Sequence, residues 1–500
     1  MREWITRHAP VVQRQISFLP SEELPYDGYR IRIDASGNIE VTYRNGRARE
    51  YALQTLQTLE ERGLEVGEYY EYPDFAMRGV VEGFYGEPYT WEIRRDVIRF
   101  LQAHRMNAYF YAPKDDPFHR DRWREAYPDG LLREIAALNS EAESCGVDFY
   151  FCLSPGKDFR FSSPDDYAAL ASKYQAVRRA GIRNFALFLD DIDPKLCAKD
   201  AEKFGSPGKA HAALADFCVS SIPSLRPWVF CPTEYMQNYD TQYRRDFRTN
   251  LRGDLIVFWT GYNTVAEAIT AEDGERVAAA FSRPLALWDN YPVNDFEPKR
   301  RLYLAAVRNR SAALKKTHCG YVVNPMSNWE ASKFALATQA EYCWNTETYN
   351  HGEAEERACA ELVPGAPEEA LELIKRNSSR LFGETDRLLP YLRSGNWQSA
   401  DAYYTRQKEM TVKLRQAMPE KMAEAFSELF RYMSEECVLY EEVKEGRVRG
   451  ETLRSLRECR WRTADQSLLR YIEEKHLTDQ PVGLEEERKI WWKLQENGNA

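Results

Sequence analysis

Asp190 and Asp191 are adjacent carboxylates at the end of an apolar run that begins at Phe185. A buried strand over this run would deliver both carboxyl groups to one point. Two carboxyl groups in different surroundings can divide bond cleavage between them, one as acid and base and the other as a stabiliser of charge, as in glycoside hydrolysis. The alternative interpretation is a helix cap or surface loop that is merely acidic.

Seven other apolar runs resemble the one before Asp190, and helical segments separate them. Thr90 and Ser163 with Pro164 supply start signals for two of these helices. Eight strand–helix units over about 270 residues predict a (β/α)8 barrel. A doubly wound sheet is the alternative, but it usually has fewer strands, and no GxGxxG motif opens a helix here. The predicted strands are 77–82, 107–111, 147–153, 184–189, 228–231, 255–259, 285–288 and 321–323.

The segments on either side of the predicted barrel have different patterns. Residues 29–43 alternate apolar and polar side chains around a Ser-Gly-Asn turn, which predicts a β-hairpin, and a helix is expected at 48–62. We therefore predict an α/β protein with a central TIM barrel at 75–350, preceded by a small α+β domain at 1–74.

Strand patterns are absent after about residue 357, and helical spacing replaces them. This predicts an all-helical domain at 351–500, which could supply a surface for oligomerisation. Apolar residues that recur at this spacing include Met422, Phe426, Leu429, Met433 and Cys437, and, near the end, Ile490, Trp491 and Leu494.

Composition argues against several classes of protein. With 68 Lys and Arg against 78 Asp and Glu, the net charge of −10 disfavours nucleic acid or an anionic membrane as the main partner. The ten cysteines form no CxxC pair, as expected of reduced thiols and not of a zinc site. The first residues lack a secretory signal, and no apolar run is long enough to span a membrane, so we expect a cytoplasmic protein without metal or cofactor.

Polar or aromatic residues follow nearly every predicted strand. In a barrel, the carboxyl ends of the strands meet at one face, where active sites are built. A purely structural barrel has no need of acids, amides and a lysine at all these points, so the set is more informative than any single motif. These strand ends are 82–86, 113–116, 154–156, 190–191, 233–235, 259–261, 288–290 and 324–325.

Five of these segments resemble the signature blocks of glycoside hydrolase family 84. That family contains the O-GlcNAcases and related bacterial β-N-acetylglucosaminidases. The resemblance runs in order from about 77 to 349, whereas the flanking domains match weakly. The blocks are RGVVEGFYG at 78–86, YAPKDDPFH at 111–119, LDDI at 189–192, PTEY at 232–235 and WDNYPVND at 288–295.

The resemblance implies retaining hydrolysis in which the 2-acetamido carbonyl of the substrate attacks the anomeric carbon and forms an oxazoline. Asp190 would orient and polarise the acetamido N–H. Asp191 would protonate the leaving oxygen and then activate water. Tyr235 would hydrogen-bond the acetamido oxygen.

The remaining expected site residues would bind the sugar. Trp288 and Thr260, with neighbours of Cys231, would shape the acetyl pocket. Tyr85 and Asp115 could be structural supports. Each residue alone also has a structural interpretation as a turn, core or surface side chain. The residues expected to bind the sugar hydroxyls are Gly83, Lys114, Asn290, Asp295 and Asn324.

Other functions remain open at the level of sequence. The expected substrate is a glycoprotein or glycan that carries β-linked GlcNAc, but chitin or hyaluronan fragments are alternatives. A non-catalytic GlcNAc-binding scaffold is a second alternative. A metal-dependent transferase is a third, because Asp191 and Asp193 form a DxD motif, and Asp115 and Asp116 add further acids that could bind Mg²⁺.

Overall fold

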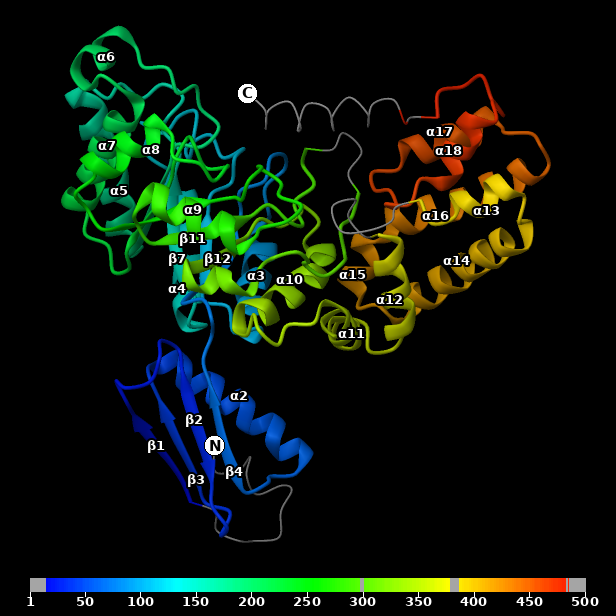
Figure 1. The fold of residues 1–500 in the computed structure, drawn as a ribbon, viewed down its shortest axis with the longest axis horizontal. Coiled ribbons are helices and arrows are strands. Elements are labelled where there is room, and N and C mark those ends of the chain that lie inside the picture. The colour runs from blue at the N-terminus through cyan, green and yellow to red at the C-terminus, as the bar shows by residue number, and fades with distance from the viewer. Residues whose placement is uncertain (1–14, 297–300, 378–385, 483, 485–500) are drawn as a thin grey trace. The chain divides into compact units, whose positions relative to one another are not determined.

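A computed structural model describes residues 15–296, 301–377, 386–482 and 484 (Figure 1). Contacts divide the chain into two compact units. The small unit ends at Ala76 and also contains Cys343–Asn345, and the large unit contains the rest. The barrel and the C-terminal helices belong to the same unit, so this division does not test the predicted boundary of a helical domain at 351. That boundary stays a prediction.

The small unit is a four-stranded sheet with one helix along it (Figure 1). The predicted hairpin and helix are confirmed, since β2 and β3 pair antiparallel and α2 buries Tyr51 and Leu56 against them. The sequence pattern does not predict β1 and β4, which are edge strands whose side chains are partly or fully exposed. The elements are β1 (Ile16–Pro20), β2 (Tyr29–Ile33), β3 (Ile39–Tyr43), α2 (Gly46–Arg62) and β4 (Gly67–Glu71).

The large unit contains the predicted barrel, and its eight strands are all parallel. They close in the order β10-β11-β12-β5-β6-β7-β8-β9. The strands are β5 (Met77–Val81), β6 (Ala108–Tyr111), β7 (Asp148–Leu153), β8 (Asn184–Phe188), β9 (Trp228–Cys231), β10 (Leu255–Trp259), β11 (Leu285–Asp289) and β12 (His318–Val323).

The start of β12 differs most from the prediction, which begins the strand three residues later. Gly320 lies where neighbouring strands approach closely. A Cβ atom there would lie 2.9 Å from Ala286 Cβ and 3.0 Å from Met77 Cβ. The close approach of the strands explains why a glycine stands at this position. Strand packing in the closed barrel causes this approach.

Helices surround the strands, and their start signals act as the sequence predicts. Thr90 Oγ1 accepts from the N–H of Ile93, and the side chain of Ser163 accepts from the N–H of Asp166 with Pro164 at the first helical position. The elements are α3 (Trp91–Ala103), α4 (Asp129–Ser144), α5 (Pro164–Arg179), α6 (Ala198–Phe204), α7 (Pro207–Ser221), α8 (Gln242–Asn250), α9 (Ala271–Phe281), the 3-10 helix η1 (Ala312–Lys316) and α10 (Trp329–Trp344).

Aromatic side chains fill the barrel below the carboxyl ends of its strands. Phe110 stacks on Tyr150 with 4.4 Å between ring centroids, and Phe258 lies 5.1 Å from Phe110. Trp288 completes this layer, 5.3 Å from Phe188 and 5.5 Å from Phe258. The packed core therefore supports the residues at the strand ends from below.

The C-terminal segment is helical, as predicted, and continues within the large unit (yellow to red in Figure 1). The apolar spacing from Met422 to Cys437 belongs to two helices that meet at Phe426, and Ile490, Trp491 and Leu494 lie outside the described residues. The helices are α11 (His351–Leu362), α12 (Pro367–Arg376), α13 (Leu389–Ser394), α14 (Trp397–Ala417), α15 (Glu420–Ala425), α16 (Ser427–Lys444), α17 (Gly450–Glu458) and α18 (Ser467–Glu474).

None of the helices in the described ranges has the length and apolar character that crossing a lipid bilayer requires.

A buried ion pair joins the end of β5 to α3. Arg94 donates to Glu82 through Nε at 2.9 Å and Nη2 at 2.8 Å, and Tyr109 also donates to this carboxylate. Both side chains are about 95% buried or more. Glu82 therefore acts as a structural residue, although it ends a strand as catalytic acids do.

We expect Arg94→Met to lower the free energy of unfolding by about 3–5 kcal/mol, because it leaves the Glu82 carboxylate buried without its cation. Urea unfolding followed by circular dichroism measures this loss. Arg99→Met on the same helix is the control, since Arg99 is exposed and its pair with Glu141 should contribute less than about 1 kcal/mol. Equal effects of the two substitutions would contradict the structural role of the Glu82 pair.

Candidate functional site

A cavity of about 280 Å³ opens where the barrel strands end. All ten site residues expected from the sequence line it, contributed by the ends of seven of the eight strands and the loops that follow them. Cys231, Tyr85, Thr264, Val265, Val293 and Phe296 complete the lining, whereas Asp115 is exposed and is not part of it. The expected residues are Gly83, Lys114, Asp190, Asp191, Tyr235, Thr260, Trp288, Asn290, Asp295 and Asn324.

Asp190 is buried at the end of β8, and its two carboxylate oxygens differ. Oδ2 is paired with Lys114 Nζ, which reaches across from the loop after β6. Oδ1 is buried and has no hydrogen-bond partner among the described residues. An acceptor held in this way can take a donor from a molecule in the cavity.

Lys114 is a buried ammonium group beside two carboxylates. Burial lowers its pKa, but the negative charges of Asp190 and Asp191 raise it by more than burial lowers it. The pKa therefore lies above the usual value for lysine. Its Nζ lies 3.9 Å from Asp191 Oδ2. Lys114 therefore stays charged at neutral pH and compensates for the negative charge at this point.

Asp191 directly follows Asp190, but its side chain is partly exposed and has different partners. Its φ angle of 50° lies in the left-handed region, which turns the two consecutive carboxylates apart. Tyr235 OH donates to Oδ1 at 2.9 Å, and Tyr85 OH donates to Oδ2 at 2.8 Å. Burial raises the pKa of Asp191, but Lys114 and the two phenols outweigh this effect, so the pKa lies below its usual value.

Amide side chains form a chain of hydrogen bonds along the opposite wall. Trp288 Nε1 donates to Asn290 Oδ1 at 2.8 Å, and Asn324 Nδ2 donates to the same oxygen at 2.9 Å. Asn290 Nδ2 donates to the carbonyl of Thr264, and Asn324 Oδ1 accepts from the N–H of Gly83 at 3.3 Å. These bonds fix the orientation of both amides and leave each with one N–H for a ligand.

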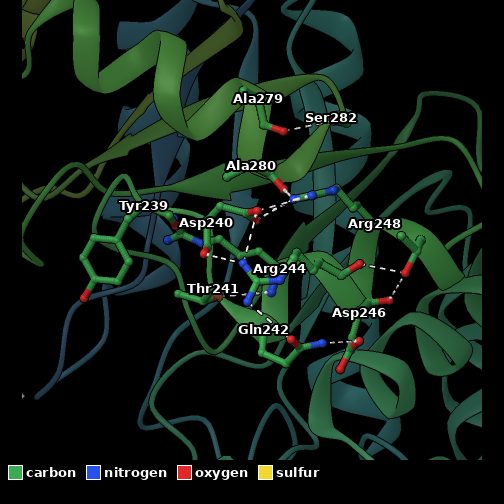
Figure 2. Close-up of polar contacts among 12 residues, drawn as sticks. Tyr239, Asp240, Thr241, Gln242, Arg244, Asp246, Arg248, Ala279, Ala280 and Ser282 are labelled. Carbon is green, nitrogen blue, oxygen red and sulfur yellow. Dashed lines mark hydrogen bonds and ion pairs between the residues drawn. The ribbon is translucent and has the colours of Figure 1, made fainter.

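Arg244 of α8 fixes the loop that carries Tyr235, and Figure 2 shows this arginine beside Tyr239 and Asp240 at the end of that loop. This buried guanidinium donates to backbone carbonyls of the loop, including Tyr239 O at 2.7 Å and Glu234 O at 3.1 Å. The carbonyl of Tyr235 itself accepts from Thr260 N at 2.9 Å, which joins this loop to the end of β10. Sequence reasoning missed Arg244, because its function depends on contacts that helix spacing does not reveal.

Sequence reasoning also missed Arg120, which follows the block at 111–119 directly. Its Nη1 donates to Tyr85 OH at 2.8 Å, and its Nη2 donates to the carbonyl of Asp191 at 3.1 Å. The phenol of Tyr85 therefore lies between Arg120 and Asp191. The position of Arg120 next to a signature block is the only sequence signal that could have identified it.

Several acids at strand ends do not face the cavity. Asp289 forms a buried ion pair with Arg310, with Nε 2.8 Å from Oδ2. Asp116 accepts from the hydroxyls of Tyr111 and Tyr127. Across the residues that the structure describes, no three His, Cys, Asp or Glu side chains are grouped so as to hold a metal ion. The carboxylates named for a transferase site therefore do not converge in this structure.

A family model described as beta-N-acetylglucosaminidase matches residues 78–375. Among curated proteins, Protein O-GlcNAcase of Rattus norvegicus and that of Mus musculus are each 36% identical over 268 residues. The match covers 52% of this chain and only 29% of the length of either relative.

Two solved structures share the fold. One, described as the structure of CpGH84B, has a TM-score of 0.75 at 24% identity and covers 95% of this chain and 88% of its own. The other is a mutant of the Thermobaculum terrenum O-GlcNAc hydrolase, with a TM-score of 0.69 at 26% identity, covering 84% of this chain and 98% of its own. The first likeness supports the architecture alone.

Gly83 is tightly packed against the Trp288 ring. A Cβ atom at this position would lie 2.5 Å from Trp288 Cζ2, and the ring is fixed by Asn290 and by the aromatic core. We expect Gly83→Ala to lower the free energy of unfolding by about 1–3 kcal/mol and to change tryptophan fluorescence. Both are measured on the purified variant.

Gly130→Ala is the matched control, because nothing lies within 4 Å of a Cβ atom there and the residue is in the first turn of α4. It should change stability by less than about 1 kcal/mol, in the stabilising direction. A Gly83→Ala protein as stable as the wild type, with an unchanged emission spectrum, would show that the Trp288 ring can move aside.

Proposed function

Because the chain belongs to the beta-N-acetylglucosaminidase family, glycoside hydrolase family 84, we propose that it hydrolyses terminal β-linked N-acetylglucosamine with retention of configuration. The chain spans less than a third of the length of the curated relatives that it matches. The activity is therefore proposed for this chain from its own site.

The observation that carries the proposal is the buried, unpartnered Oδ1 of Asp190. An acetamido group offers one N–H donor, and a carboxylate acceptor would hold that donor and raise the electron density on the carbonyl oxygen. Because Lys114 fixes Oδ2, the direction in which Oδ1 accepts is fixed as well. This arrangement supports a mechanism in which the acetamido oxygen is the nucleophile, aligned by proximity.

Asp191 is suited to act as acid and then as base. In the free protein it is ionised, because two phenols and Lys114 stabilise the carboxylate. Tyr235 turns from Asp191 Oδ1 to the acetamido oxygen when the sugar enters, so that Oδ1 can carry the proton for the leaving oxygen. After the oxazoline forms, the ionised carboxylate takes a proton from the attacking water.

The remaining lining residues fit a single sugar. Lys114, Asn290 and Asn324 supply donors, Asp295 supplies a carboxylate, and Gly83 lines the cavity beside the Trp288 ring. Trp288, Thr260 and Cys231 enclose the acetyl methyl group. A cavity of about 280 Å³ lies at the small end of ligand sites, which suits one pyranose and not an oligosaccharide.

The group attached to GlcNAc is proposed to be a glycoprotein or glycan, and the curated relatives are named as protein O-GlcNAcases. We propose a cytoplasmic location, which fits ten free cysteines. Rates on a GlcNAc-bearing glycopeptide, a chitin oligomer and a hyaluronan fragment distinguish the natural substrates.

An aryl substrate series tests the proposed function. We expect an aryl β-GlcNAc to be hydrolysed with retained β configuration, seen by NMR at early times. The corresponding β-glucoside, which lacks the acetamido group, should be essentially inert. Progressive fluorination of the N-acetyl group should slow the reaction, because the carbonyl oxygen becomes less basic. An inverted product, or a sugar ester trapped on an Asp or Glu, would overturn the mechanism.

The two aspartates should respond differently to the leaving group. We expect Asp191→Asn to slow hydrolysis of a poor leaving group by about 10²-fold or more, and to spare the first step for a highly activated aryl group. Asp190→Asn should slow both substrates on the order of 10²-fold, because it weakens the internal nucleophile. Kinetics on a series of aryl leaving groups check this, and equal slopes for the two variants would refute the division of roles.

A further inference from the structure

Arg120 contacts the site in two places. It follows His119 in the loop after β6 and is 5% exposed. Its Nη1 donates to Tyr85 OH at 2.8 Å, and its Nη2 donates to the backbone carbonyl of Asp191 at 3.1 Å. Its Nε is buried and has no hydrogen-bond partner in the described part of the chain. The hydrogen bonds of this buried cation are thus directed at Asp191 and at the phenol beside it.

The contact with Tyr85 fixes the direction of the next hydrogen bond. A guanidinium group can only donate, so the oxygen of Tyr85 must accept from it. The phenol has one hydrogen, and Asp191 Oδ2 lies 2.8 Å from its oxygen. The hydrogen of Tyr85 is therefore directed to Oδ2, which must accept it.

We propose that Arg120 is a positioning residue that acts through Tyr85, holding Asp191 Oδ2 as a permanent acceptor so that the catalytic proton is carried on Oδ1. This proposal rests on the proposed function and deepens it. Oδ1 is the oxygen that Tyr235 occupies in the free protein. Release of Tyr235 to the substrate would then prepare only one of the two oxygens to act as acid.

The backbone contact supports the same role. Asp191 adopts a φ angle of 50°, which is unfavourable for a residue with a Cβ atom and persists where surrounding contacts enforce it. Arg120 Nη2 donates to the carbonyl of this residue, and Thr233 Oγ1 donates to the carbonyl of Leu189, two residues earlier, at 2.7 Å. Arg120 therefore contributes to both the backbone turn and the side-chain orientation.

The charge of Arg120 also favours the ionised form of Asp191. A cation behind the phenol makes Tyr85 a stronger donor, and this stabilises the carboxylate. Lys114 acts in the same direction but is shared with Asp190. Loss of Arg120 should therefore raise the pKa of Asp191 while Lys114 remains. The titratable and charged groups that face Asp191 are Tyr85 after β5, Lys114 and Arg120 after β6, Asp190 after β8 and Tyr235 after β9.

The first measurement is the titration of Asp191 in the free protein. Carboxyl ¹³C NMR of aspartate-labelled protein, with the signal assigned by its loss in Asp191→Asn, reads this pKa without requiring activity. We expect Arg120→Met and Tyr85→Phe each to raise it by about 0.5 to 1 unit. Arg120→Met in the Tyr85→Phe background should add less than half of its single effect, because the phenol that transmits it is gone. Arg120→Lys, which keeps the charge, should lie between Arg120→Met and the wild type.

The second measurement is the pH profile of kcat/KM on a β-GlcNAc substrate with a poor leaving group. Because Asp191 must be protonated to act as the acid, a higher pKa moves the basic limb to higher pH by the same amount. Arg122→Met is the matched control, since Arg122 is exposed, lies two residues away and pairs with Glu125. Its profile should match that of the wild type.

The outcomes separate the two proposals. An unchanged pKa of Asp191 in either Arg120→Met or Tyr85→Phe would overturn the role of Arg120, whatever the activity. Fully additive shifts in the double variant would also overturn it, because Arg120 would then act without Tyr85. A wild-type protein that fails to hydrolyse aryl β-GlcNAc would instead refute the proposed function. The NMR titration would still test whether Arg120 acts on Asp191 through Tyr85.

Discussion

Closure of eight parallel strands into one barrel is the constraint on which the rest of the structure depends. In a closed parallel barrel every strand ends at the same rim, so residues from 83 to 324 in the sequence can line one small cavity. The aromatic layer of Phe110, Phe188, Phe258 and Trp288 fills the barrel below the rim. Because that layer is close-packed, Trp288 serves both as the top of the core and as a wall of the site.

The buried ammonium group of Lys114 gives the adjacent carboxylates of Asp190 and Asp191 different surroundings. Lys114 Nζ pairs closely with Asp190 Oδ2, which holds Asp190 in one orientation, whereas its distance to Asp191 Oδ2 is 3.9 Å. Asp191 instead accepts hydrogen bonds from Tyr85 and Tyr235. The left-handed backbone at Asp191 makes this possible, since it turns consecutive side chains in different directions. Different surroundings give the two acids different chemistry, although they are identical in type and adjacent in sequence.

The same rim contains acids that stabilise the fold. Glu82 and Asp289 end barrel strands, yet each is held in a buried ion pair, with Arg94 and Arg310 respectively. These pairs anchor surrounding elements to the strand ends and thereby support the loops that form the site. Whether a carboxylate at a strand end lines the cavity or is held in the fold thus depends on its partners, and the partner cations come from distant parts of the chain.

The sequence by itself determined the barrel and the N-terminal hairpin and helix, because periodicity and turn chemistry are local properties. The ten residues that meet in the cavity were expected because the sequence blocks resemble those of glycoside hydrolase family 84, and motif order is also readable along the chain. Only the tertiary structure decided that Glu82 turns away from the cavity, that Oδ1 of Asp190 lacks a partner, and that Arg120 and Arg244 support the site. These facts depend on which side chains from separate loops fill the same volume. A single sequence does not encode such contacts in any local pattern, since direction and distance between distant residues are set only when the barrel closes.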